Sequence, residues 1–268
     1  MLVYKMHALG QDFCLVEAEA YMDYSKLAIK LCNRILGIGA LGLIVVKYDP
    51  LEMVYYTNQG ERMPMNANAI RCFSKFVFEK GMGVKNHIDI TTGDGKINVE
   101  KVSDRPFMAS VALGKPILNN SMIRVSDELN CFGRTILVGN KYFTLYSLYL
   151  ADIETVIFVD DFDNCLDYAK DISSYPIFSR GTNVNFVKVL SKDTIRVKSY
   201  DRLNGFLESS GSGCAASVYV AQKLGYTKTN VKAEVEMGTL RVEITKKGII
   251  NLTGMANSIF TCDFKEEE

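Results

Sequence analysis

The chain has 268 residues, of which 48% are hydrophobic and 23% are charged, and its 31 basic and 31 acidic side chains balance. This length suits one large domain or two lobes of roughly 130 residues each. A balanced charge provides no net field to attract nucleic acid or an anionic membrane, so we expect a small molecule or another protein as partner.

The cysteines and histidines indicate a cytoplasmic protein without a metal site. The seven cysteines show no paired spacing, which is typical of reduced thiols. The two histidines, His7 and His87, belong to no zinc-binding pattern. No signal-peptide pattern begins the chain, and no apolar run approaches the roughly 20 residues of a membrane helix. We therefore expect a soluble protein in the cytoplasm.

The first half of the chain predicts one helix among strands. Asn66 and Gly81 bound the helical segment, because Asn caps helix N-termini and Gly ends helices in the left-handed conformation. Apolar residues at helical spacing should face the core, namely Ile70, Phe73 and Val77. Strand-like runs separated by turns surround this helix, at residues 53–56, 87–92 and 95–100.

The second half repeats this layout 144 residues later. Ser210 and Gly225 bound the second helix, whose expected core residues are Cys214, Val218 and Ala221. The matching strands are expected at residues 196–200, 231–236 and 239–244. Such a duplication predicts two similar lobes, each directing the positive end of one helix toward a shared carboxylate site.

The repeat also predicts where the lobes divide. We expect a first lobe at residues 1–115 and a second at 116–250, because a new hydrophobic pattern begins near the Pro-containing segment Leu113–Leu118. The last strand-like stretch, within residues 252–264, follows the completed second repeat. We expect this strand to return to the first lobe.

Five motifs in order resemble the diaminopimelate epimerase family, the pyridoxal-independent amino-acid epimerases. They lie at Lys5–Phe13, Gly37–Gly42, Arg71–Phe73, Phe158–Asp161 and Arg180–Phe186. The resemblance covers nearly the full chain. It implies an α/β (α+β) fold of two pseudo-symmetric lobes, each a mostly antiparallel sheet wrapped around a central helix. It also implies no cofactor and favours a homodimer.

The resemblance also shows a departure at the residues that carry the family's chemistry. In that family two cysteines, one at each helix N-terminus, remove and deliver the α-proton. Asn66 and Ser210 stand at these positions here. An amide does not accept this proton, and a serine without a base is a weak acid and a weak base. Cys72 and Cys214 lie further into the helices, where we expect buried core thiols.

Other positions that contact substrate in the family are matched or replaced conservatively. Asp201 replaces a Glu and Gln11 replaces an Asn, while Gly211 and Gly213 keep the glycines of an anion-binding turn. The full set of expected substrate-binding residues is Gln11, Asn58, Ala67, Asn68, Asn183, Asp201, Arg202, Gly211 and Ser212.

Glu154 is the leading candidate for a proton-transferring group. The family's N-P-H segment becomes Asp152-Ile153-Glu154, so a carboxylate replaces a histidine of the site. A carboxylate whose pKa is raised by burial can move a proton between carbons. The related phenazine-biosynthesis isomerases lack the cysteine pair, which implies that one carboxylate suffices. Asp201 and Glu208 have weaker claims, and an exposed or salt-bridged structural role for Glu154 is the alternative.

Three functions stay open at this point. The first is an isomerase or epimerase that acts on an amino acid or related carboxylate by cofactor-independent proton transfer without the cysteine pair. The second is a catalytically inactive relative that binds an amino-acid-like ligand or a protein partner. The third is diaminopimelate epimerase activity itself, through an unrecognised catalytic pair.

Overall fold

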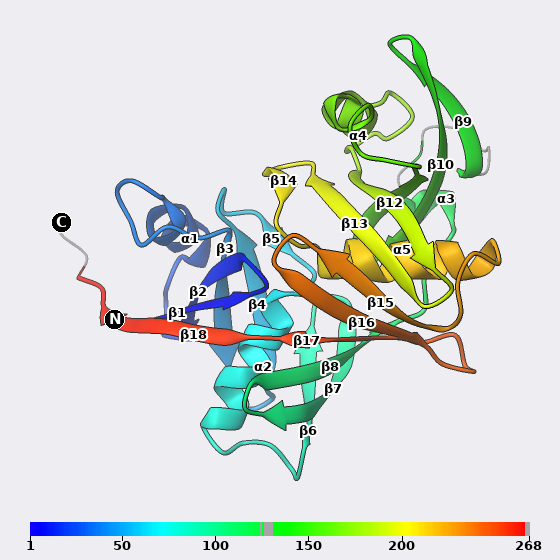
Figure 1. Ribbon diagram of the computed structural model, residues 1–268. Helices are drawn as coiled ribbons and strands as arrows, with labels where there is room; N and C mark the ends of the chain where they lie inside the picture. The colour runs from blue at the N-terminus through cyan, green and yellow to red at the C-terminus, as the bar shows by residue number, and fades with distance from the viewer. Residues whose placement is uncertain (124, 126–130, 266–268) are drawn as a thin grey trace. The chain divides into compact units, whose positions relative to one another are not determined.

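The protein forms two compact units, seen in a computed structural model that describes residues 1–123, 125 and 131–265 (Figure 1). The first unit contains Met1–Ala112 and Thr253–Glu268, and the second contains Leu113–Leu252. The chain passes from one unit to the other within two strands, β8 (Phe107–Gly114) and β17 (Ile250–Met255).

The first unit is built from strands around one long helix, with a shorter helix packed on the sheet. Its remaining elements are β1 (Leu2–Ala8), β2 (Gln11–Glu17), α1 (Tyr24–Cys32), β3 (Gly42–Lys47), β4 (Glu52–Thr57), β5 (Arg62–Met63), α2 (Ala69–Glu79), β6 (His87–Thr92), β7 (Gly95–Asp104) and β18 (Asn257–Asp263). The C-terminal strand β18 runs antiparallel beside β1, from Leu2 paired with Asp263 to His7 paired with Asn257.

The second unit also combines strands with one long helix, and it has further short helices. They are α3 (Asn120–Ile123), β9 (Phe132–Val138), β10 (Lys141–Leu150), β11 (Asp152–Phe158), the short 3₁₀ helix η1 (Leu166–Tyr168), α4 (Ala169–Ser173), β12 (Asn183–Ser191), β13 (Thr194–Asp201), β14 (Gly205–Leu207), α5 (Gly211–Lys223), β15 (Asn230–Val235) and β16 (Gly238–Ile244). Figure 1 shows β9 and β10 as a long hairpin.

The strand pairings show that the two units repeat one topology. In the first unit β1–β2 is antiparallel, β2–β3 parallel, β3–β4 antiparallel, β4–β6 parallel and β6–β7 antiparallel. In the second unit β10–β11, β11–β12, β12–β13, β13–β15 and β15–β16 follow the same sequence of directions. The α/β fold class and the duplication expected from the sequence are therefore confirmed.

Each sheet curves around one helix of its own unit. In the first unit α2 packs against β1, β2, β3, β4 and β18, and in the second α5 packs against β10–β13, β15 and β16. The expected core residues of both helices are all buried. Both helices are followed by the expected glycine with positive φ, Gly81 (74°) and Gly225 (75°).

The two helix starts differ from each other. Ser210 is the N-cap of α5, as expected, and its side chain accepts a hydrogen bond from the Gly213 N–H. The expectation for the first helix is wrong by two residues, because α2 begins at Ala69 with Asn68 as its N-cap and not directly after Asn66. The Asn66 side chain instead accepts hydrogen bonds from the N–H groups of Asn68 and Ala69, each at 2.9 Å. It therefore stabilises a turn that precedes the helix.

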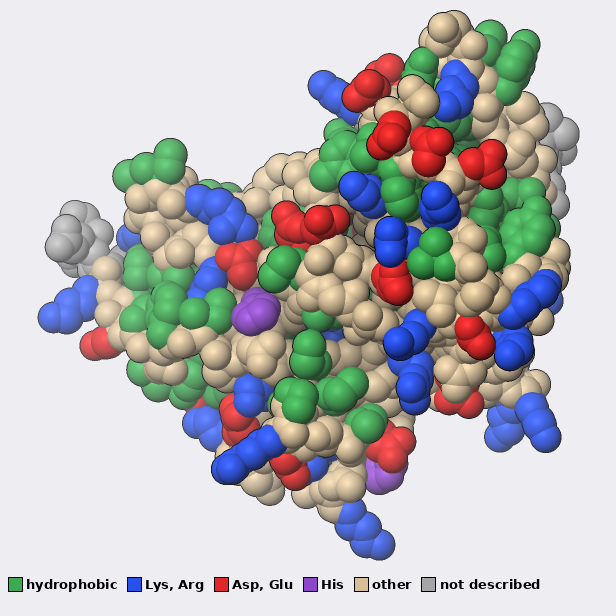
Figure 2. Space-filling model, in the orientation of Figure 1, with side chains coloured by type: hydrophobic (Ala, Val, Ile, Leu, Met, Phe, Trp, Pro, Cys, Tyr) green, Lys and Arg blue, Asp and Glu red, His purple; other side chains and the backbone are tan. Residues whose placement is uncertain are grey.

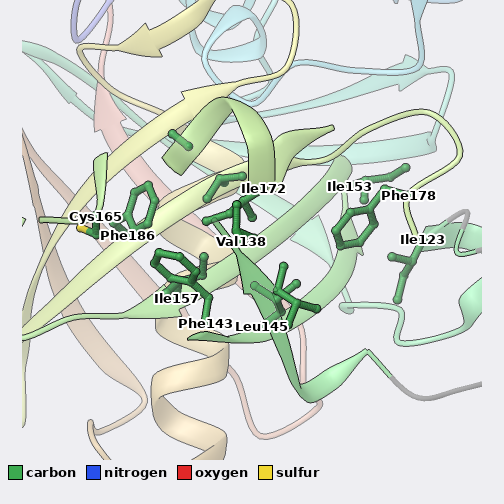
Figure 3. Close-up of a cluster of buried hydrophobic side chains, with 13 residues drawn as sticks. Ile123, Val138, Phe143, Leu145, Ile153, Ile157, Cys165, Ile172, Phe178 and Phe186 are labelled. Carbon is green, nitrogen blue, oxygen red and sulfur yellow. The ribbon is translucent and has the colours of Figure 1, made fainter. Parts of the chain in front are cut away.

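A hydrophobic cluster on the outer face of each sheet completes the cores. In the second unit Ile172 of α4 packs among Phe143, Ile157 and Phe186 of the sheet (Figure 3). In the first unit α1 covers the sheet in the same way, with Leu27 and Leu31 buried in the cluster. These clusters hold the strands whose ends carry the candidate site residues.

The surface has the mixed charge that the composition predicts. Figure 2 shows basic and acidic side chains interspersed over the visible face. Within the described part of the chain, no helix is long and apolar enough to cross a membrane.

Candidate functional site

Three neighbouring strands gather polar side chains in the second unit. Glu154 of β11 pairs in register with Asn183 of β12, and Asp201 ends β13 next to it. Helix α5 packs against all three strands and begins nearby. Because these residues stand at strand starts and ends fixed by the sheet, the fold holds them in one place.

Glu154 is fully buried, with 0% of its surface exposed. Its Oε2 atom accepts a 2.7 Å hydrogen bond from Asn185 Nδ2, and its Oε1 atom lies 3.4 Å from Asn183 Nδ2. The Ser212 side chain forms a further hydrogen bond with it. Burial, followed by the charge of Asp152, raises the pKa of Glu154 from 4.5 to about 7, and these hydrogen bonds only partly oppose that rise. The carboxyl group therefore changes charge near neutral pH.

The hydrogen bonds to Glu154 are fixed by a second layer of contacts. Ser199 Oγ donates to Asn185 Oδ1 at 2.7 Å, which leaves the Asn185 amide nitrogen directed at Glu154. Asn185 also lies directly under the first turn of α5. A Cβ atom built on Gly213 would come within 2.0 Å of Asn185 Oδ1, so glycine permits this close approach.

The equivalent positions of the first unit are apolar. Phe13 pairs in register with the first residue of β3, as Glu154 does with the first residue of β12, so Phe13 is the counterpart of Glu154. By the same register Ile44 and Tyr55 are the counterparts of Asn185 and Ser199. Phe13 and Ile44 are fully buried, and the Phe13 and Tyr55 rings contact edge to face with centroids 6.0 Å apart. The same topology thus accommodates either the apolar residues of the first unit or the polar residues of the second. The fold itself does not require the polar residues.

The start of α5 contributes two serines with different roles. Ser210 is buried and its Oγ accepts a 3.0 Å hydrogen bond from the Gly213 N–H, so it acts as a helix cap. Ser212 is only half-buried and contacts Glu154. Ser212 therefore connects the buried carboxyl group to the surface.

An ion pair lies beside Glu154. Arg202 Nη1 donates to Asp152 Oδ2 at 2.6 Å, and both side chains are largely buried. Asn183 bridges them, because its Oδ1 accepts from the Arg202 N–H at 3.1 Å and its Nδ2 lies 3.3 Å from Asp152 Oδ2. Burial opposes the charge of Arg202, but the nearby carboxylates outweigh it and raise the pKa of Arg202. The guanidinium group is therefore a permanent cation held within the cluster.

The remaining carboxylate candidates have other surroundings. Asp201 Oδ1 accepts hydrogen bonds from the N–H groups of Leu203 and Asn204, so it shapes the turn after β13. Glu208 is exposed. Cys72 and Cys214 are fully buried, as expected, and burial raises the pKa of the Cys72 thiol to about 12. Neither thiol is in a position typical of a reactive cysteine.

The first unit contains a separate group of predicted residues before α2. Ala67 and Asn68 are almost fully buried and are held by Arg71, which is 0% exposed. Arg71 Nη1 donates to Ala67 O at 2.9 Å and Nη2 donates to Asn68 Oδ1 at 2.6 Å. Together with the hydrogen bonds to Asn66, these bonds engage polar groups of the turn with other residues of the chain.

Gln11 and Asn58 lie at the same end of the strands in the first unit. Gln11 is the first residue of β2, and Asn58 directly follows β4, whose Thr57 lies beside Gly42 in β3. In the second unit Asp152, the first residue of β11, and Arg202, which directly follows β13, lie at the corresponding strand ends. The structure thus brings Asp152, Glu154, Asn183, Arg202 and Ser212 together in the second unit, and Asn66, Ala67 and Asn68 together in the first.

Sequence reasoning missed three residues that organise these groups. Asn185 and Ser199 support Glu154, and Arg71 supports the turn before α2. Asn185 gave a usable signal, since it is a polar residue two positions after Asn183 and lies between the apolar residues Val184 and Phe186. Ser199 gave no such signal.

A groove of the second unit lies at the C-terminal end of β11, away from Glu154. Its volume is about 780 Å³, and Phe158, Val159, Asp160 and Asp161 contribute to its wall. None of the predicted site residues lines it. No group of three or more His, Cys, Asp or Glu suited to a metal ion occurs among the residues that the structure describes.

Comparison with known proteins identifies relatives over nearly the full chain. The sequence model of the family described as diaminopimelate epimerase matches residues 3–118 and 151–259. A diaminopimelate epimerase of Caldanaerobacter subterraneus subsp. tengcongensis is 35% identical, over 96% of each chain. Another from Clostridium perfringens is 34% identical, over 97% of each chain.

Solved structures show the same fold at low sequence identity. A phenazine biosynthesis protein of the PhzF family from Bacillus anthracis superposes with a TM-score of 0.72 at 12% identity, over 99% of each chain. A hydroxyproline epimerase from Agrobacterium vitis also has a TM-score of 0.72 at 12% identity, over 98% of this chain and 91% of the other. At such identities the likeness concerns the fold alone.

Proposed function

Because the chain belongs to the diaminopimelate epimerase family, we propose that it is an isomerase that moves a proton on an amino acid or related carboxylate without a cofactor. In this proposal Asn66 and Ser210 replace the two family thiols, and Glu154 holds the transferred proton. The substrate is a small molecule, and the expected reaction class is racemisation, epimerisation or a proton shift between neighbouring carbons.

The observation that carries the proposal is the burial of Glu154 where the repeated fold accommodates Phe13. A buried carboxyl group destabilises the folded state unless hydrogen bonds fully offset the loss of its hydration. The first unit avoids that cost, because it has Phe13 at the same position. The pKa of Glu154, raised to about 7, also suits a group that accepts and returns a proton near neutral pH.

Ser212 provides a route between Glu154 and a substrate. Its hydroxyl contacts the carboxyl group and is itself half-buried. In the proposed step the substrate carbon gives its proton to Ser212 Oγ while the Ser212 hydroxyl proton moves to Glu154. Return of the proton to the neighbouring carbon completes a proton shift. Racemisation or epimerisation requires that the proton return to the opposite face of the same carbon, so the substrate must turn over in the site before it is reprotonated. The backbone N–H groups at the start of α5 stabilise the substrate carboxylate.

The test is proton exchange in heavy water. Amino acids, including L-lysine and both L,L- and meso-diaminopimelate, are incubated with the protein and followed by proton NMR. We expect loss of an α-proton signal for at least one compound, and loss of that activity in Glu154→Gln. Glu234→Gln is the matched control, because Glu234 is a partly exposed carboxylate of the same unit that pairs with Arg196. Exchange that persists in Glu154→Gln would contradict the assigned role of Glu154.

A second candidate function is a catalytically inactive relative that binds an amino-acid-like ligand or a protein partner. It is favoured by the turn before α2, where Asn66 and Arg71 already engage polar groups of Ala67, Asn68 and Ala69. Ligand-induced thermal stabilisation without proton exchange in any compound of the panel would support this function over the first.

We also propose that the protein works as a cytoplasmic homodimer. Exposed apolar residues on and beside β18 support this, with Leu2, Ile259 and Phe260 each about half exposed. All seven cysteines are free, which supports the cytoplasmic location, because thiols stay reduced there. Light scattering after size-exclusion chromatography tests the mass, and Phe260→Lys is expected to produce a monomer. A monomeric wild-type protein would contradict the dimer.

A further inference from the structure

We propose that Asp152 determines the substrate class by neutralising Arg202, so that the ligand group facing this pair is an ammonium or a neutral group and not a carboxylate. The inference rests on the proposed function, because it concerns the same site in the second unit. It assigns Asp152 a role in substrate specificity, in addition to the effect of its charge on Glu154.

The guanidinium group of Arg202 already forms an ion pair within the chain. Its Nη1 atom lies 2.6 Å from Asp152 Oδ2, with 15% and 21% of the two side chains exposed. Asn183 accepts a hydrogen bond from the Arg202 backbone N–H and its Nδ2 atom lies 3.3 Å from Asp152 Oδ2, so it links the Asp152 side chain to the backbone of Arg202. A charge-assisted pair that is largely removed from water, and whose carboxylate is positioned by a further hydrogen bond, is not readily exchanged for an external anion.

The charges around Arg202 also disfavour a carboxylate. Its guanidinium group lies in the field of three carboxyl groups, Asp152, Asp201 and Glu154. Asp152 balances the single positive charge of Arg202, and the ionised form of the neighbouring Glu154 makes the cluster negative. A ligand carboxylate placed here would meet net repulsion, whereas an ammonium group would be attracted.

The counterpart positions in the first unit carry no such charge. Gln11 stands where Asp152 stands, and Asn58 stands where Arg202 stands. A neutral amide at the first position is therefore compatible with the repeated backbone. This makes Asp152→Asn a conservative substitution that releases Arg202 without changing the size of the side chain.

The experiment compares two ligands that differ by one carboxylate. L-Lysine has the structure of meso-diaminopimelate without the carboxylate on the carbon that bears the second amino group. Dissociation constants of both compounds are measured by isothermal titration calorimetry for wild type, Asp152→Asn and Glu234→Gln. The last variant removes the ion pair between Arg196 and Glu234 of the same unit and serves as control.

We expect wild type to bind L-lysine at least about tenfold more tightly than meso-diaminopimelate, and Asp152→Asn to reduce that ratio by about tenfold or more. Glu234→Gln should keep the wild-type ratio. The proposal is overturned if wild type prefers meso-diaminopimelate, if it binds neither compound, or if Asp152→Asn leaves the ratio unchanged. The wild-type ratio alone tests the proposal if the variant does not fold.

These outcomes separate the specificity role from the proposed catalysis. A preference for L-lysine without α-proton exchange would retain the role of Asp152 and remove the isomerase function. Exchange accompanied by a preference for the dicarboxylate would retain the function and remove the role of Asp152.

Discussion

Asn185 Nδ2 lies 2.7 Å from the Oε2 atom of Glu154, and both side chains are completely buried. The first unit places Ile44 and Phe13 at the same register positions, where they pack as part of an apolar core. Because the backbone topology is shared, the polar pair is a feature of the site and not of the fold. Its stability cost and its ionisation are both measurable.

Replacing Glu154 by Gln should change the pH dependence of stability. The folded protein holds the Glu154 proton up to about pH 7, whereas the unfolded chain releases it near pH 4.5. The free energy of unfolding of wild type should therefore fall, relative to Glu154→Gln, as the pH rises from 4.5 to 7. A shift of this size corresponds to about 3 kcal/mol. Urea unfolding at pH 5 and pH 8 measures the difference, and parallel curves for the two proteins would contradict it.

Replacing Asn185 by Leu should make the ionised form of Glu154 less stable. Leu keeps the approximate shape of Asn but removes the N–H that donates to the carboxylate, so the pKa of Glu154 should rise above about 7. The expected loss of stability at pH 8 is on the order of 2 kcal/mol. The same substitution in a Glu154→Gln background is the control. An equal loss in both backgrounds would show that Asn185 does not act through the charge of Glu154.

The rate of α-proton exchange should follow the ionisation of Glu154. Ionised Glu154 accepts the proton, so the rate should increase with pH with a midpoint at about 7. Ser212→Ala removes the hydroxyl that passes the proton to Glu154, so the exchange rate should fall sharply at every pH. Exchange measured by NMR between pH 5.5 and 9 tests both effects. A rate independent of pH in this range would assign the proton transfer to another group.

The repeated architecture could be predicted from the sequence because its signals are local. Caps, terminal glycines and apolar periodicity recur 144 residues apart, and Ser210, Gly81 and Gly225 play the expected parts. The start of α2 was misplaced because Asn66 caps a turn instead of the helix. Both conformations satisfy the same Asn side chain, so the residue type does not distinguish them.

The composition of the candidate site was less accessible from sequence. Glu154 was identified by its place in a family motif, but its burial depends on the pairing of β11 with β12. The Asp152 and Arg202 pair joins residues 50 positions apart, and Asn185 and Ser199 meet across two strands. Such contacts depend on register, which follows from the packing of the whole sheet.

Replacing Gly213 by Ala tests the close packing of α5 on Asn185. In most helices this change stabilises by up to about 1 kcal/mol, because glycine has the greater conformational entropy to lose. Here the added Cβ would lie 2.0 Å from Asn185 Oδ1, so we expect destabilisation of several kcal/mol, on the scale of core overpacking. An Asn185→Ala background should relieve most of that loss. A raised melting temperature in Gly213→Ala alone would contradict the geometry.

Arg71 should be more important for the turn before α2 than for the helix itself. Its guanidinium group donates to Ala67 O and Asn68 Oδ1 and is completely buried. Arg71→Met keeps the length of the side chain but leaves these acceptors without their donor, which should cost on the order of 3 kcal/mol. Arg71→Lys should lose nearly as much, since one ammonium group does not reproduce the planar fork. Thermal unfolding of both variants measures the cost, with Lys75→Met in the same helix as control. If Arg71→Lys matched wild type, a point charge would suffice and the directed hydrogen bonds would not be what holds Ala67 and Asn68 in place.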